Sequence, residues 1–235
     1  ARLQSASEKT DSLDVKELLK SAYEHQQHGR YEESREVYDQ AAKQLGEITP
    51  QTAEANLKLQ QGLIELDRLT GKTSAAIKRL EAAIKQTPDQ PLLHAVGARL
   101  TYETGEYNKA HQYVARALAL DSDQPLAHLI QAHLLTDAGK IDEANEGYRW
   151  FVRYYNRAQP EDAETLLQIA EGATQYARWN SVSQIFTFVI NTVCPDALKA
   201  DPLAWQASYI SGSILQEKYN RPQAADEFTA ALKIN

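Results

Sequence analysis

The sequence repeats itself with a period of 34 residues, and this period limits the folds that are open to the chain. Segments 89–94 (DQPLLH) and 123–128 (DQPLAH) agree at five of six positions. The same register continues beyond them, pairing Gly105 with Gly139 and Ala110 with Ala144. Repeats of this length are single supersecondary units that bury their apolar faces only by stacking on one another. The period therefore predicts an elongated array of stacked units.

Apolar residues within the units recur at helical spacing. Between residues 52 and 69, Leu59, Leu63, Leu66 and Leu69 follow one another at intervals of three and four, and Gly71 then ends the pattern. No alternation of apolar and polar residues is long enough to form a strand between the Gly and Pro residues. The pattern predicts an all-α fold.

A 34-residue unit of two helices and a turn resembles the tetratricopeptide repeat (TPR) family. The segment 105–110 (GEYNKA) carries the family's turn, with a Gly that ends the first helix and an Ala that lets the second helix approach closely. The resemblance implies about six repeats in a right-handed superhelical solenoid of antiparallel helix pairs, with the first helices lining a concave face. The small residue of each second helix is assigned to Ser34, Ala76, Ala110, Ala144, Val182 and Ala224, at spacings of 42, 34, 34, 38 and 42.

The ends of the chain suggest a solenoid that continues. Residues 1–12 form a polar lead-in and residues 13–235 one solenoid, which we expect to be part of a longer protein. The sequence holds no Met, so Ala1 is not a translation start. The last segment, 230–235, resembles the end of a second TPR helix without a polar capping helix after it.

Charge and composition restrict the partners. With 25 basic and 32 acidic residues the net charge is −7, which disfavours binding to nucleic acid because phosphates are bound through clustered Lys and Arg. No apolar run approaches the roughly 20 residues that span a bilayer. The single cysteine, Cys194, leaves the compartment open between cytoplasm and periplasm.

We find no constellation that predicts catalysis, a metal or a cofactor. Gly71-Lys72-Thr73 lacks the earlier glycine of a phosphate-binding loop, and Cys194 is expected in a loop with no His near it. His94 and His128 recur at one repeat spacing, too far apart for one metal ion, and are expected to be structural. His25 and His28 are interpreted as a solvated pair on one helix face.

Two further groups of side chains have a packing interpretation and a binding one. Arg149, Arg153 and Arg157 recur at intervals of four, and form either a solvated helix face or a contact for an anion. A nearby aromatic group fits inter-repeat packing better than a ligand cage. This group comprises Tyr148, Trp150, Phe151, Tyr154 and Tyr155.

The concave face is the expected binding surface. On each first helix a small residue turns toward the neighbouring helix, so residues one and four places later face the groove. The candidate groove residues are Tyr23, Glu65, Arg68, Arg99, Tyr102, Leu129, Ile130 and His133, with Leu19, Val96, Leu167 and Tyr209 beside them. Arg68 and Arg99 are expected to be the positive points of the groove.

These features favour a non-catalytic scaffold that binds a protein or peptide segment, or another domain of its own chain, in the groove. The Lys, Arg and Asn pattern with which TPR co-chaperones grip a terminal carboxylate is absent, because Tyr23 and Gly62 stand at the Asn positions. A neutral or partly apolar peptide therefore fits better. The alternatives are an accessory region of a larger enzyme or a self-assembling solenoid, and the oligomeric state is left open.

Overall fold

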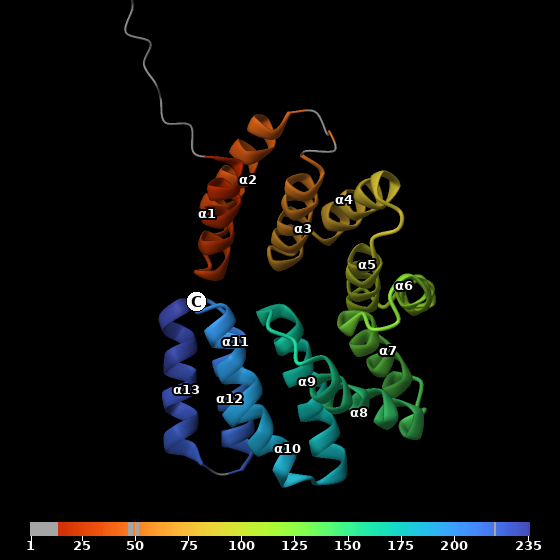
Figure 1. The fold of residues 1–235 in the computed structure, drawn as a ribbon, viewed down its shortest axis with the longest axis vertical. Coiled ribbons are helices and arrows are strands. Elements are labelled where there is room, and N and C mark those ends of the chain that lie inside the picture. Colours follow the sequence, from red (N-terminus) through yellow and green to blue (C-terminus); the bar gives the residue numbers. More distant parts are fainter. Residues whose placement is uncertain (1–13, 47–48, 50–51, 219) are drawn as a thin grey trace, which may run out of the picture.

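The structure, a computed structural model, describes residues 14–46, 49, 52–218 and 220–235. The predicted lead-in, 1–12, lies outside this part. The described chain forms six consecutive pairs of antiparallel helices and contains no strand, which confirms the predicted all-α repeat fold (Figure 1). The first four pairs are α1 (Val15–Gln27) with α2 (Tyr31–Leu45), α3 (Ala53–Leu69) with α4 (Thr73–Gln86), α5 (Pro91–Glu103) with α6 (Tyr107–Leu120), and α7 (Pro125–Asp137) with α8 (Ile141–Ala158).

The fifth and sixth pairs depart from the regular pattern in length. α9 (Ala163–Asn180) is followed by one interrupted helix made of α10 (Ser183–Phe188), a π-helical turn η1 (Val189–Val193) and α11 (Cys194–Ala200). α12 (Trp205–Glu217) and α13 (Arg221–Ile234) form the last pair. Longer helices accompany the departures from the 34-residue period, because α3 and α9 have 17 and 18 residues whereas α5 and α7 have 13.

Cys194 lies inside the interrupted helix, so its placement in a loop was wrong. Pro195 has no N–H to donate to the preceding turn, and its ring would clash with the carbonyl four residues earlier. The π turn Val189–Val193 widens the backbone just before it. Cys194 is 1% exposed, and burial raises the pKa of its thiol to about 11. The thiol is therefore neutral at physiological pH and a poor nucleophile.

Small residues hold the two helices of a pair together. Ala76, Ala110 and Ala144 are fully buried, and the Ser34 hydroxyl donates a hydrogen bond of 2.8 Å to the carbonyl of Ala22. Counted from the start of each second helix, this position in the fifth pair falls at Phe186, so the assignment to Val182 was wrong. The shift arises because α9 has 18 residues, whereas α5 and α7 have 13.

Glycines on first helices admit aromatic rings from second helices. A Cβ atom on Gly62 would lie 2.3 Å from the hydroxyl oxygen of Tyr38. Glycine at this position, where TPR co-chaperones carry Asn, is therefore required by packing. Gly172 accepts the ring of Phe151 in the same way, between α9 and α8.

The solenoid curves until its two ends touch, which the sequence did not predict. Figure 1 shows the C-terminal end of α13 beside the C-terminal end of α1. Nδ1 of His28 lies 2.7 Å from the carbonyl oxygen of Ile234, and the Asn235 side chain donates to the carbonyl of Gln27 at 2.9 Å. The Tyr23 hydroxyl donates to Asp201, just before α12. His28 is therefore a contact between the ends, and its interpretation as a solvated residue was wrong.

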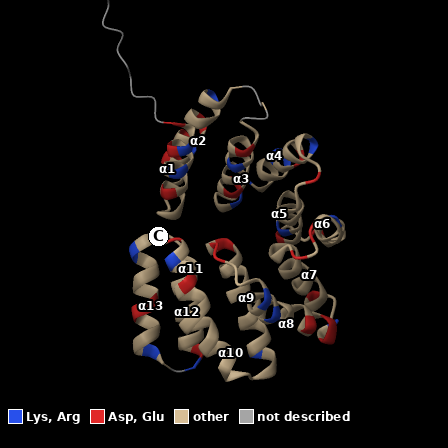
Figure 2. Cartoon of the chain, in the orientation of Figure 1, with Lys and Arg blue, Asp and Glu red and all other residues tan. Residues whose placement is uncertain are grey.

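Charged residues are spread over all six pairs and do not gather on one face (Figure 2). Over the part of the chain that the structure describes, no helix has the length and apolar character needed to cross a membrane.

Candidate functional site

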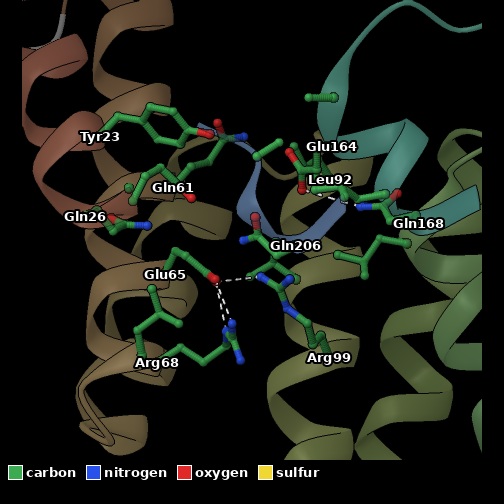
Figure 3. A pocket seen from close by; sticks show the side chains of 18 of the residues that line it. Tyr23, Gln26, Gln61, Glu65, Arg68, Leu92, Arg99, Glu164, Gln168 and Gln206 are labelled. Atoms are coloured by element: carbon green, nitrogen blue, oxygen red, sulfur yellow. Dashed lines mark hydrogen bonds and ion pairs between the residues drawn. The ribbon is translucent and has the colours of Figure 1, made fainter. Parts of the chain in front are cut away.

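The inner face of the closed array surrounds a central cavity of about 890 Å³. Its walls come mainly from the first helix of each pair, as the resemblance implied (Figure 3). All eight candidate groove residues line it, namely Tyr23, Glu65, Arg68, Arg99, Tyr102, Leu129, Ile130 and His133. Leu129 and Ile130 are each only 3% exposed, so most of their surface belongs to the core.

The flanking residues Leu19, Val96 and Leu167 also line the cavity, but Tyr209 does not. The Tyr209 side chain is 54% exposed, and its ring packs against Trp205 and Phe228. Its expected place beside the groove was therefore wrong.

A network of ion pairs crosses the cavity wall between α3 and α5. Arg68 binds Glu65 through two hydrogen bonds, Nη2 to Oε1 at 2.7 Å and Nε to Oε2 at 2.9 Å. Nη2 of Arg99 donates to Oε2 of the same carboxylate at 2.7 Å, and Arg68 also pairs with Glu103 at 3.1 Å. Burial acts to raise the pKa of Glu65, but Arg99 and Arg68 outweigh it and lower that pKa below its usual value.

The sequence predicted Arg68 and Arg99 as the positive points of the groove. Their ion pairs show that neither guanidinium group is free. Glu65 pairs with both guanidinium groups, Glu103 provides the second negative charge through Arg68, and Glu65 lies one repeat length, 34 residues, before Arg99. The pairing joins neighbouring repeats at equivalent levels. Arg99 still has an unused donor, because its buried Nε has no hydrogen-bond partner among the residues that the structure describes.

Two of the tyrosines that line the cavity, Tyr23 and Tyr102, also connect different helix pairs. Tyr23 donates to Asp201, and Tyr102 donates to Asp137 at 2.9 Å. Burial and these carboxylates raise the pKa of both phenols, so both remain neutral donors. The Tyr102 ring lies 5.6 Å from that of His133, whose Nε2 is 3.6 Å from Glu171. Burial lowers the pKa of His133 despite that carboxylate.

Several amide side chains line the cavity with unused hydrogen-bonding capacity. Gln26 is 4% exposed, yet its Oε1 has no hydrogen-bond partner in the described chain, and the same holds for the buried Oε1 of Gln206. A buried polar atom without a partner carries a desolvation penalty that a ligand could relieve. In Figure 3, Gln26 and Gln61 come from one wall, and Gln206 lies between them and Gln168 in this view.

The sequence contained a signal for these missed residues. The spacing rule that selected Tyr23 also selects Gln26, four places after Ala22, and Glu171, one place after Ala170. Glu164 and Gln206 needed a further rule, because both lie six places before the small residue of their helices. This position lines the cavity in five of the six pairs, as Lys16, Leu92, Leu126, Glu164 and Gln206. It lies one helical turn before the positions that gave Leu19, Val96 and Leu167, which are two or three places before the small residue.

The other sequence candidates contribute to structure. His94 and His128 each place Nε2 at 2.8 Å from the carbonyl six residues earlier, which confirms their structural role. Arg149 and Arg153 pair with Glu146, and Arg157 with Asp123, which favours the solvated helix face. The aromatic group packs, with Tyr148 and Phe151 buried and Trp150 stacked on His128 at 3.8 Å. No group of three or more His, Cys, Asp or Glu side chains in the described residues could hold a metal ion.

Comparison with known proteins identifies the repeat. Residues 19–91 and 68–125 match a family model described as tetratricopeptide repeat. Comparison with curated proteins gives no match. The solved structure of the APC/C hetero-tetramer Cut9-Hcn1 aligns with a TM-score of 0.53 at 12% identity, over 94% of this chain and 40% of that chain. This likeness shows a shared fold.

Two further solved structures align less well. YrrB, described as a TPR protein with an unusual peptide-binding site, gives a TM-score of 0.43 at 15% identity, over 94% of this chain and 87% of its own. PilF of Pseudomonas aeruginosa gives 0.49 at 11% identity, over 91% and 88%.

Proposed function

Because this chain is a tetratricopeptide repeat protein, we propose that it is a non-catalytic scaffold that binds a peptide segment of a partner protein in its central cavity. A repeat fold alone names no function, so the proposal depends on the cavity. The observation that carries it is a set of buried polar atoms in the walls of one cavity, on Gln26, Gln206 and Arg99, that have no partner within the described part of the chain.

The size and lining of the cavity suit a short extended peptide. A volume of about 890 Å³ lies near the upper end of the range of ligand sites, roughly 300–1,000 Å³. A peptide backbone offers a donor and an acceptor at each residue, and glutamine side chains can satisfy both. Leu19, Val96 and Leu167 add apolar surface for side chains of the segment.

The pKa shifts of three hydrogen-bonded groups of the cavity support binding over catalysis. Glu65, the most heavily paired carboxylate of the cavity, is held ionised by two guanidinium groups, and Tyr23 and Tyr102 are held neutral. A general acid or base needs a pKa near the working pH, and these shifts move away from it. Cys194 is buried in the interrupted helix and does not line the cavity.

A peptide-display selection followed by binding measurements tests this function. Peptides of twelve residues are selected against the whole chain, and their affinities are measured by fluorescence anisotropy. Gln61→Trp, which fills the cavity from α3 without removing an ion pair of the network, is expected to weaken binding at least about tenfold. Gln40→Trp, the same change on an exposed position of α2 outside the cavity, is the matched control.

Equal affinity for the wild type and Gln61→Trp would place the binding surface elsewhere. Failure to select any peptide that binds would reject the proposed function as a whole.

A further inference from the structure

Among the carboxylates that line the cavity, Glu164 is the one that forms no ion pair with any residue that the structure describes. It lies in the first turn of α9, and the hydrogen bond that it accepts in the described structure comes from Nε2 of Gln168 at 3.4 Å, which is long. The other carboxylates of the cavity have basic neighbours. Arg68 and Arg99 bind Glu65, Arg68 binds Glu103, and His133 lies beside Glu171.

The surroundings of Glu164 disfavour its charge. The side chain is exposed to the water of the cavity, and the cavity walls exclude part of the bulk water around it. This desolvation raises the pKa of Glu164, and Glu65 and Asp162 add to the effect, while Arg99 opposes it only in part. A ligand cation would offset this unfavourable field.

Two unpartnered acceptors provide a second, independent observation. Oε1 of Gln26, on a side chain that is 96% buried, and Oε1 of Gln206 both lack hydrogen-bond partners in the described structure. They belong to α1 and α12, and Glu164 to α9, so three helix pairs bring acceptors to one cavity (Figure 3). By comparison, the described residues contain one buried side-chain donor without a partner, Nε of Arg99.

An excess of acceptors calls for a ligand group that is rich in donors. An ammonium has three donors and a guanidinium five, and both carry a positive charge that would neutralise the Glu164 carboxylate. Lys16, Lys20 and Lys58 also line the cavity, but all three are exposed. Lys20 lies 3.8 Å from Glu24, and Lys58 lies 2.8 Å from Glu54.

We propose that the cavity selects a peptide with a lysine or arginine side chain, whose cationic group is bound by Glu164 with the Gln26 and Gln206 amides as further acceptors. The proposal rests on the proposed function and names the chemistry of its ligand. It replaces the sequence-based expectation of a neutral peptide.

A synthetic library tests the selectivity directly. Hexapeptides with both ends capped, and with all residues except Cys at equal frequency, are passed over the immobilised chain, and the retained pool is sequenced by mass spectrometry. Lys and Arg are expected to be enriched about threefold to tenfold with the wild type. Glu164→Gln is expected to abolish the enrichment. Glu161→Gln, which removes the same charge three residues earlier and outside the cavity, should retain it.

A second variant guards against an effect of Glu164→Gln on folding, which circular dichroism and thermal melting would reveal. Gln206→Leu removes one amide acceptor at similar volume and is expected to reduce the same enrichment. A retained pool without excess Lys and Arg, or an equal excess with Glu164→Gln, would overturn this inference and leave the proposed function standing.

Titration with small molecules distinguishes failure of the proposed function from failure of the cation site. If the wild type retains no peptide, the proposed function fails, and n-butylammonium and n-butylguanidinium are titrated against n-butanol while the melting temperature is followed. Stabilisation by the two cations that is lost in Glu164→Gln would preserve the cation site with small amines as its source. No difference from n-butanol would reject the site.

Discussion

At the residue scale, two glutamates of one cavity have opposite electrostatics. Glu65 accepts hydrogen bonds from two guanidinium groups, which lower its pKa, whereas the pKa of Glu164 is raised because its desolvation in the cavity is not compensated by an ion pair in the described structure. The sequence predicted that Glu65 faces the groove, since helix periodicity fixes which face a residue occupies. It did not predict the pairing with Arg99, because that depends on the distance between two helices from different repeats.

Glu65→Gln is expected to destabilise the fold by about 1–3 kcal/mol at pH 7, since it removes charge-assisted hydrogen bonds and leaves Arg99 without an ion pair and Arg68 with Glu103 alone. The pKa of Glu65 is lower in the folded than in the unfolded state. Its stabilisation is therefore present above the unfolded pKa and is lost as the pH falls through the folded one. Urea unfolding at pH 7 should show a large difference in free energy of unfolding from the wild type, and at about pH 3 a smaller one.

Glu54→Gln is the matched control for this experiment. Glu54 lies on the same helix, α3, but its pair with Lys58 is fully exposed to solvent. We expect no measurable change in the free energy of unfolding. If Glu65→Gln behaved in the same way, the network would contribute nothing to stability.

Glu164→Gln is expected to act in the opposite direction and raise the melting temperature of the free chain at pH 7. The pKa of Glu164 is higher in the folded than in the unfolded state, so ionised Glu164 disfavours folding above the folded pKa. This penalty disappears as the pH falls and the carboxyl becomes protonated in both states. Melting curves of both proteins between about pH 7 and pH 3 should therefore converge at the acid end. A variant less stable than the wild type at pH 7 would contradict this prediction.

At the element scale, the sequence predicted helix pairs and their number because turn glycines and apolar periodicity are local signals. Gly105 follows the last turn of α5 with φ +76°. The Glu106 N–H then donates a hydrogen bond of 2.8 Å to the carbonyl of Thr101, and this bond caps the C-terminal end of the helix. The π turn before Cys194 was missed because Pro195 permits either a loop or a widened helix. The surrounding packing decides between them, as the full burial of Val189 and Val193 shows.

Gly172→Ala is expected to destabilise the fold by about 1–3 kcal/mol, although alanine favours helices by about 1 kcal/mol over glycine. The added Cβ would lie 2.2 Å from Cδ2 of Phe151. That ring is fully buried and packed edge-on against Trp150 at 5.1 Å, so it has little room to move. Thermal or urea unfolding measures the effect.

Gly147→Ala serves as the comparison, because its Cβ would lie 3.2 Å from Cβ of Ala132, a contact that a small shift relieves. The double variant Gly172→Ala with Phe151→Leu should recover part of the loss. If Gly172→Ala were as stable as the wild type, the close approach of α8 and α9 would not restrict this position.

At the scale of the whole molecule, the sequence predicted stacking but not closure. Each helix pair is rotated slightly against the next, and these rotations accumulate over six pairs until the ends meet. The total rotation depends on the packing at every interface between helix pairs, so no local sequence pattern predicts it. Closure also explains why residues from all six pairs line one cavity.

Weakening the contacts between the ends is expected to open the array without unfolding its repeats. Tyr23→Phe combined with His28→Ala removes the hydrogen bonds to Asp201 and to the carbonyl of Ile234, about 1–3 kcal/mol in total. Stacking within and between neighbouring pairs is untouched, so the helical circular dichroism signal should remain. Small-angle X-ray scattering should show a larger radius of gyration, and hydrogen exchange should become faster in the last turn of α13. Tyr107→Phe with His111→Ala makes the same two changes on the outer helix α6 and should leave both measurements unchanged. A scattering curve identical to that of the wild type would mean that stacking alone sets the curvature, with the end contacts following from it.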